Sequence, residues 1–117
     1  MSAADAISTS VERREGITVL LVDGVVDLAT SPPLEELVTE LIDENPNALV
    51  IDLTAVSFLA SVGLRILAET HERVGGAGKF AVVATGPVTA RPIQLTKLDE
   101  FLALYSSIDD AVAALRA

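Results

Sequence analysis

The sequence predicts an α/β fold in which about four helices pack on a small, mixed but mostly parallel β-sheet. The first observation is the order of elements, because strand-like and helix-like segments alternate along most of the 117 residues, as they do in sheets joined by helical crossovers. The second is the nearly continuous apolar run of residues 48–53, expected for a strand covered on both faces. The third is composition: 50% of the residues are hydrophobic but only 3% are aromatic, so the core is aliphatic.

The length bounds the organisation of the chain. A chain of 117 residues lies in the commonest size range for one domain and can bury a core, so we predict a single domain over residues 1–117. Residues 1–6 are small and polar and are expected to fray. The sequence contains no internal repeat and no low-complexity segment.

An antiparallel hairpin is expected at the start of the sheet. Residues 7–12 alternate weakly between apolar and polar, residues 13–16 read Arg-Arg-Glu-Gly and predict a turn, and residues 17–22 form a strongly apolar strand. The pair Asp23-Gly24 is expected to end this strand, because both residues favour turns.

The first helix is expected to begin at Ser31. Pro32 then takes the first helical position, where its missing N–H costs nothing. Apolar residues recur on one face with helical spacing, glutamates lie largely outside it, and residues 45–47 (Asn-Pro-Asn) end the helix. The apolar face comprises Leu34, Leu37, Val38, Leu41 and Ile42.

The centre of the chain is a strand over residues 48–53 that leads through a short loop into a helix beginning at Ser61. A serine at a helix start normally accepts a hydrogen bond from a backbone N–H two or three residues further on. The same position tolerates a phosphate ester, because the first helical turn carries unpaired N–H groups and the positive end of the helix dipole. The predicted inward face of this helix comprises Leu64, Leu67, His71 and Val74.

The last third of the chain predicts two more strands and two more helices. Residues 75–78 (Gly-Gly-Ala-Gly) are expected to stop the second helix rather than to cradle a phosphate, because they follow a helix and precede a strand. A buried strand over residues 79–84 comes next, then a helix over 88–98 that is broken or kinked by Pro92. Residues 101–105 predict the last strand.

A capping pair and an apolar stripe predict the final helix. Ser107, with Asp110 three residues later, resembles a capped helix start. Apolar residues then recur with helical spacing, which predicts that one face of the helix packs on the sheet. These residues are Ile108, Ala111, Val112 and Leu115.

Charge and cysteine content exclude several classes of function. Eight Lys and Arg residues against 17 Asp and Glu give a net charge of −9, so direct nucleic-acid binding is not expected. The charge suits a partner with a basic face, although it also aids solubility by itself. The absence of cysteine rules out disulfides and thiolate metal sites. No apolar stretch approaches the roughly 18 residues of a membrane span, so we expect a cytoplasmic protein without membrane association.

Catalysis has little support in the sequence. His71 is the only histidine, so no histidine metal cluster is available. The sequence context shows no plausible Ser-His-Asp set, and we expect no metal and no cofactor. Asp27 and Asp52 are candidates for a pair of acids, but carboxylates near strand ends more often cap loops or helices. We therefore predict that the chain is not an enzyme.

A central motif resembles that of STAS domains, specifically the single-domain anti-sigma factor antagonists. It consists of Asp52-Leu53-Thr54, then Val56 and Phe58, then Ser61-Val62-Gly63-Leu64. In that family the segment ends a central strand and opens a helix, and the serine that matches Ser61 is phosphorylated by a partner kinase. The resemblance also implies a small mixed sheet with about four helices, in agreement with the pattern of elements.

The resemblance implies a regulatory switch. The unphosphorylated chain is expected to bind an anti-sigma factor with a serine kinase fold and so to release a sigma factor, and phosphorylation of Ser61 is expected to turn it off. Ala60 stands where the family usually has an acidic residue, and Val62 where it has Ser or Thr. These departures keep an alternative open, a STAS scaffold or transporter-accessory module that is never phosphorylated. Whether the chain forms a homodimer is also left open.

The predicted partner surface surrounds Ser61. Asp27 matches a family aspartate that lies beside the phosphorylated serine. Val62 and Ile66 fall on the helix face turned away from the predicted core, so we expect them to form a small apolar patch. Arg65 replaces a residue that is often small in the family, and it either pairs with a partner or blocks one. The predicted partner-binding residues are Asp27, Thr30, Ser31, Ala60, Ser61, Val62, Gly63, Arg65, Ile66 and Glu69.

Overall fold

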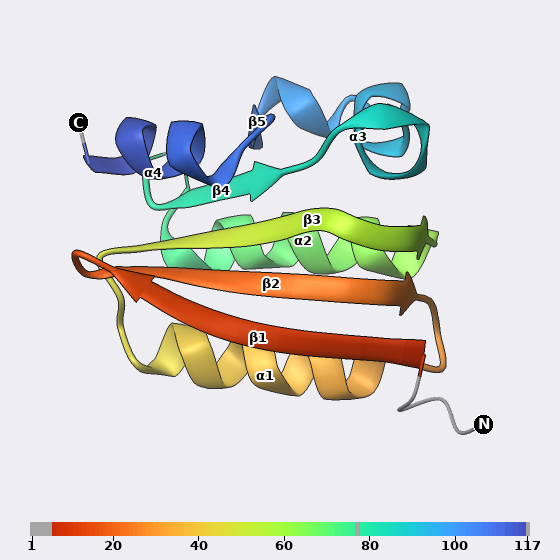
Figure 1. The fold of residues 1–117 in the computed structure, drawn as a ribbon, viewed down its shortest axis with the longest axis horizontal. Helices are drawn as coiled ribbons and strands as arrows, with labels where there is room; N and C mark the ends of the chain where they lie inside the picture. Colours follow the sequence, from red (N-terminus) through yellow and green to blue (C-terminus); the bar gives the residue numbers. More distant parts are fainter. Residues whose placement is uncertain (1–5, 77, 117) are drawn as a thin grey trace.

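A computed structural model describes residues 6–76 and 78–116, and it contains a five-stranded sheet with four α-helices (Figure 1). The predicted fold class is therefore confirmed, whereas the predicted fraying of the N-terminus lies almost wholly outside the described residues. The elements, in chain order, are β1 (Ile7–Arg14), β2 (Ile17–Val26), α1 (Ser31–Asp43), β3 (Ala48–Leu59), α2 (Ser61–Val74), β4 (Phe80–Val83), α3 (Gly86–Leu95), a short 3₁₀ helix (Leu98–Glu100), β5 (Ala103–Tyr105) and α4 (Ile108–Arg116).

The strands lie in the sheet in the order of the sequence, β1-β2-β3-β4-β5. β1 runs antiparallel to β2, and every later pair is parallel. Glu15 and Gly16 connect β1 to β2 with φ angles of 54° and 85°, which is the left-handed pair that a tight hairpin turn requires. The predicted hairpin and the mostly parallel sheet are both confirmed.

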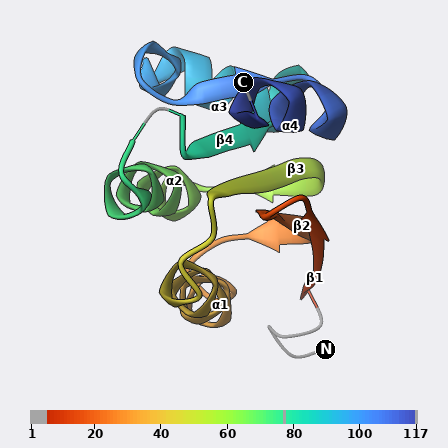
Figure 2. The ribbon, with the colours of Figure 1, turned by 90° about the vertical axis from the view of Figure 1, so that its left-hand side faces the viewer.

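Helices cover both faces of the sheet, as the apolar run of residues 48–53 predicted (Figure 2). One core joins α1, α2 and α3 to one face, where Leu20 and Ile51 point, and a second core joins α4 to the opposite face, where Val19 and Val50 point. All four of these strand side chains are at most 2% exposed. Successive side chains of β2 and β3 therefore pack alternately into two different cores, which explains the uninterrupted apolar runs in these strands.

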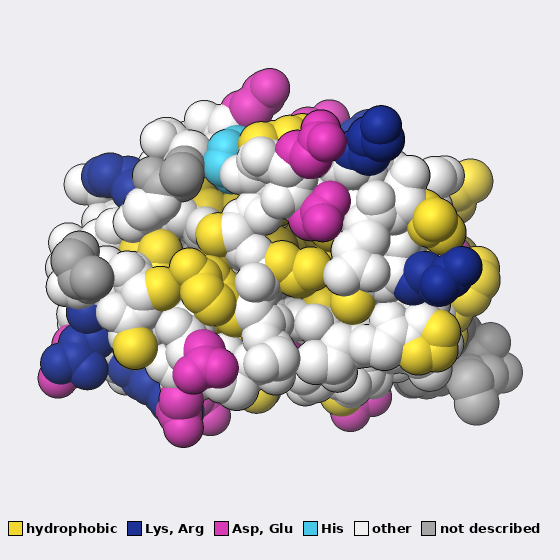
Figure 3. All heavy atoms as spheres, turned by 90° about the horizontal axis from the view of Figure 1, so that it is seen from above, with side chains coloured by type: hydrophobic (Ala, Val, Ile, Leu, Met, Phe, Trp, Pro, Cys, Tyr) yellow, Lys and Arg dark blue, Asp and Glu magenta, His cyan; other side chains and the backbone are white. Residues whose placement is uncertain are grey.

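The side of the molecule at which α3, β5 and α4 lie is apolar near its centre (Figure 3). Charged side chains lie mainly toward its margins in that view.

The capping pair predicted for α4 is present, because the N–H of Asp110 donates to Ser107 Oγ at 3.1 Å. Ala111 and Val112 of α4 are buried against the sheet, so the predicted stripe of this helix is confirmed.

β2 and β3 are longer than predicted. Asp23-Gly24 does not end β2, which continues to Val26, and β3 continues to Leu59. The added residues pair with each other, up to Val26 beside Leu59, through two register irregularities. Gly24 has φ +102° and a Cβ there would lie 2.2 Å from the carbonyl oxygen of Ala6, so this glycine permits a bulge instead of a chain reversal.

The later elements shift by a few residues from their predicted bounds. Gly75 ends α2 in the left-handed conformation, with the Gly76 N–H donating to the carbonyl of His71, as the predicted helix stop requires; Ala77 lies outside the described residues. α3 begins at Gly86 instead of residue 88 and continues past Pro92, so the helix is not broken there. None of the helices within the described residues has the length and apolar character to cross a membrane.

Candidate functional site

The candidate site lies at the sheet edge where β2 and β3 end and α1 and α2 begin. The two strands are parallel, so both connections leave the sheet at the same edge. A backbone hydrogen bond joins the connections, because the N–H of Ala60 donates to the carbonyl oxygen of Val26 at 2.9 Å. Asp27 and Ser61 therefore each follow directly on one of the two bonded residues, so this bond holds their backbones near each other.

The loop between β2 and α1 is closed by reciprocal hydrogen bonds. The N–H of Asp27 donates to Thr30 Oγ1 at 2.9 Å, and the N–H of Thr30 donates back to Asp27 Oδ1 at 3.0 Å. The same carboxylate accepts from the N–H of Ala29, and the Thr30 hydroxyl donates to the carbonyl of Val25. Asp27 is thus a loop cap, and Thr30, which is 1% exposed, holds the loop from inside.

Ser61 is the first residue of α2, and its side chain is exposed. The flanking cap residue is Ala60, without a side-chain hydrogen bond, so capping does not account for the serine at this position. Ser61 is the residue after the N-cap. Its hydroxyl has no hydrogen-bond partner within residues 6–76 and 78–116. The hydroxyl is consequently accessible at the positive end of the helix dipole.

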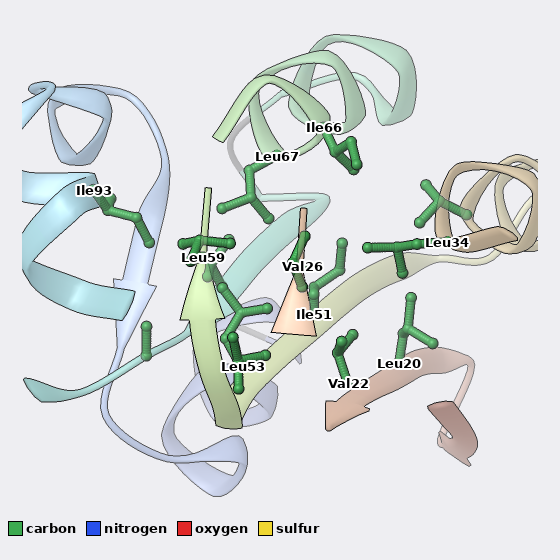
Figure 4. Close-up of a cluster of buried hydrophobic side chains, with 14 of the residues drawn as sticks. Leu20, Val22, Val26, Leu34, Ile51, Leu53, Leu59, Ile66, Leu67 and Ile93 are labelled. Atoms are coloured by element: carbon green, nitrogen blue, oxygen red, sulfur yellow. The ribbon is translucent and has the colours of Figure 1, made fainter. Parts of the chain in front are cut away.

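Val62 and Ile66 do not face solvent, so the predicted apolar patch on α2 is wrong. They are 8% and 4% exposed and belong to the core that joins α1, α2 and the sheet. Figure 4 shows Ile66 on the side of its helix that faces Leu34 of α1. By contrast, Leu64, which was predicted to lie inward, is only partly buried.

The reason for this difference is the neighbouring helix. α1 lies beside α2, so the buried stripe of α2 is turned toward the groove between α1 and the sheet. A hydrophobic pattern within one helix gives the width of an apolar face, but not which neighbour covers its margins. The buried residues of α2 are Val62, Gly63, Ile66, Leu67 and Thr70.

Two other apolar side chains are exposed at this edge of the sheet. Leu28, at the tip of the closed loop, is 80% exposed, and Phe58, near the end of β3, is 53% exposed. The register places Phe58 opposite Val25, two residues before Asp27. The sequence analysis named neither residue, although Leu28 lies in a turn, outside any strand or helix period.

Arg65 pairs with its own chain. Its guanidinium lies 3.0 Å from Glu35 Oε1 on α1 and 3.0 Å from Glu69 Oε1 on α2. The hydrogen bond with Glu69, followed by the charge of Glu35, raises the pKa of the Arg65 guanidinium above its usual value. Arg65 therefore ties the N-terminal halves of α1 and α2 together, and it also pairs with Glu69, another predicted contact residue.

Gly63 and Ser31 are buried and serve the fold. Ser31 is 4% exposed, and its hydroxyl donates to the carbonyl of Leu28 at 3.4 Å. A Cβ at Gly63 would lie 2.4 Å from Leu59 Cδ1 and 3.0 Å from Val26 Cγ1, so this glycine allows α2 to approach the strand ends. A direct role of Thr30, Ser31, Val62, Gly63 and Ile66 in partner binding stays a prediction.

We expect Gly63→Ala to lower the free energy of unfolding by about 1 kcal/mol, because overpacking against Leu59 and Val26 outweighs the better helix propensity of alanine. Denaturant titration measures this change. The double variant with Leu59→Ala is the control, since it removes the nearest clashing methyl group. Equal effects of Gly63→Ala in both backgrounds would show that no such clash exists.

The remaining polar candidates do not form a reactive site. Asp52 is 6% exposed, and its carboxylate accepts from the N–H of Thr54 at 3.0 Å; it lies opposite Leu21 in the sheet, far along β3 from the end that Asp27 adjoins. His71 is partly buried, and its ring lies edge-on to that of Phe101, with 5.5 Å between the two ring centroids. Across the described ranges no three His, Cys, Asp or Glu side chains are grouped to hold a metal ion.

Comparison with known proteins agrees with this geometry. Residues 8–111 match the family model described as STAS domain. The anti-sigma-F factor antagonist RsfB of Mycobacterium tuberculosis (strain H37Rv) is 50% identical over 116 residues, 99% of this chain and 95% of the relative.

Solved structures show the same relationship. An anti-sigma factor antagonist from Mycobacterium paratuberculosis has 50% identity and a TM-score of 0.93, with all of both chains covered. The anti-sigma factor antagonist SpoIIAA in its unphosphorylated form shares the fold at 14% identity, with a TM-score of 0.75 over 93% of this chain and 96% of that one. The chain belongs to the STAS domain family, among the anti-sigma factor antagonists.

Proposed function

We propose that this chain binds an anti-sigma factor and thereby releases a sigma factor. The observation that carries the proposal is the exposed Ser61 hydroxyl beside the exposed apolar side chains of Leu28 and Phe58, in a chain 50% identical to an anti-sigma-F factor antagonist. Apolar side chains presented on a rigid loop are suitable anchors for a partner, because docking orders few additional groups.

The docking surface in this proposal is the loop of residues 27–30, the end of β3 and the first turn of α2. It replaces the patch of Val62 and Ile66, whose side chains lie in the core. Ala60, Arg65 and Glu69 complete the exposed or partly exposed margin of the surface.

The proposed partner has a serine kinase fold and switches the chain off by phosphorylating Ser61. The Ser61 oxygen would form the new bond to the terminal phosphorus of ATP, the bond to the ADP oxygen would break, and the hydroxyl proton would pass to a base of the kinase. The product carries about −1.5 to −2 additional charge. If desolvating this charge opposes docking by about 3 kcal/mol, the affinity falls more than a hundredfold without any refolding.

The proposed mode of action is binding rather than catalysis, and its place is the cytoplasm, where sigma factors act. The net charge of −9 favours a protein partner with a basic surface over nucleic acid. Within the described residues, the carboxylates that were candidates for acid catalysis cap backbone N–H groups instead.

Variants of Ser61 test the proposal. The purified chain is mixed with the cognate anti-sigma factor and ATP, and calorimetry and mass spectrometry follow binding and phosphate transfer. We expect Ser61→Ala to bind as the wild type does but to remain unmodified, and Ser61→Glu to bind at least tenfold more weakly, because a carboxylate supplies only part of the charge of a phosphate. Unchanged binding by both variants and no phosphate on Ser61 of the wild type would contradict the switch.

A constitutive STAS scaffold or transporter-accessory module is the second candidate. The observation in its favour is the neutral pair around Ser61, because Ala60 and Val62 supply neither an acidic residue nor a second hydroxyl. The same mixture separates the two functions: a scaffold binds its partner equally well with and without ATP, whereas a switch is released as phosphate accumulates on Ser61.

A further inference from the structure

Arg65 stands one helical turn after Ser61 on α2. Residues four apart on a helix are neighbours on its surface, with Cβ atoms about 5–6 Å apart. Long helical side chains also lean toward the N-terminal turn. A guanidinium at position 65 can therefore reach a group attached to Ser61 Oγ through rotation of its own side chain.

The present partners of Arg65 can be exchanged. The side chains of Arg65, Glu35 and Glu69 are 49%, 36% and 52% exposed, and ion pairs between exposed groups are weak because water and salt screen them. Each carboxylate offers a single negative charge. A phosphate offers about −1.5 to −2 charge and three oxygens, which match the planar fork of a guanidinium.

We propose that Arg65 is the binding group for a phosphate on Ser61, and that phosphorylation moves its guanidinium from Glu35 to the phosphate. The inference rests on the proposed function, since it needs a phosphate at that serine. Arg65 is the cation that stands four residues after Ser61 on α2, where residues lie on the same surface of a helix.

The exchange changes more than one charge on the docking surface. In the unmodified chain one guanidinium serves two carboxylates on two helices. After the exchange the carboxylate of Glu35 has lost its cation, and the tie between the N-terminal halves of α1 and α2 is released. The net charge of the surface changes only by the charge of the phosphate, but the negative charge is redistributed, because Glu35 is left without its cation.

A phosphate titration tests the inference without any kinase. Phosphoserine is installed at position 61 during synthesis of the full chain, and ³¹P NMR gives the second pKa of the phosphate. We expect this pKa to be about 1 unit lower in the wild type than in Arg65→Gln, the lower end of the effect of a contacting cation. Arg73→Gln is the matched control, because Arg73 lies on the same helix and bonds Thr39 instead, and it should titrate as the wild type does. Arg65→Lys should restore part of the shift.

The resonance of the Arg65 Nε–H reports contact directly. It should shift on phosphorylation and follow the titration of the phosphate. Equal phosphate pKa values in the wild type and Arg65→Gln, or an Arg65 resonance that does not follow the phosphate, would overturn the inference. Neither result would contradict the proposed function. The proposed function fails instead if the partner neither binds the unmodified chain nor phosphorylates Ser61.

Discussion

Leu28→Asp should weaken binding to the anti-sigma factor by about a hundredfold or more while the fold stays intact. Leu28 is 80% exposed, so its removal costs the folded chain almost nothing, within about 0.5 kcal/mol. In a docked complex the same position would be desolvated, and a carboxylate there loses its hydration as well as the apolar contact. Calorimetry against the cognate anti-sigma factor measures the affinity, and thermal unfolding measures the fold.

Leu95→Asp is the matched control for this experiment. Leu95 is 69% exposed on α3, comparable with Leu28, but it lies outside the proposed surface. It should leave both affinity and stability unchanged. If Leu28→Asp binds as tightly as the wild type, the loop of residues 27–30 is not part of the interface.

Ile66→Ala should lower the free energy of unfolding by about 2–4 kcal/mol, the usual cost of removing a buried isoleucine and leaving a cavity. Ile66 is 4% exposed and lines a small apolar space with Leu34 and Val38 of α1 and with strand residues of the sheet. The space is too small to admit water, so a smaller side chain leaves its neighbours without contact partners. Denaturant titration with an unchanged m-value gives the loss.

The control for this prediction is Leu28→Ala, which removes a comparable volume from an exposed position and should change stability by less than about 0.5 kcal/mol. A small loss of stability in Ile66→Ala, together with weaker partner binding, would support the orientation that the sequence pattern predicts and contradict the packing of α2 described above.

Local patterns predicted the elements well because those patterns have local causes. The alternation of strands and helices, the Gly75 helix stop and the Ser107 cap depend on residues close in sequence, and all three are present. Ser61 was also located correctly at the start of a helix, because the change from an apolar run to helical spacing marks that junction.

Features that depend on contact between two segments distant in sequence could not be predicted from local patterns. The orientation of Ile66 depends on α1, and the continuation of β2 past Gly24 depends on pairing with β3. Arg65 illustrates both cases: its bond to Glu69 follows from a spacing of four residues, whereas its bond to Glu35 arises only when α1 and α2 lie side by side.

The closed loop before α1 separates shape from recognition. Its backbone course is held by Asp27 and Thr30, whereas the side chains of Leu28 and Ala29 point to solvent and support nothing in the fold. Both positions can therefore be substituted with little effect on the free energy of unfolding. In the proposed interface, exchange of this dipeptide alone should therefore change which partner the chain binds while its free energy of unfolding stays the same.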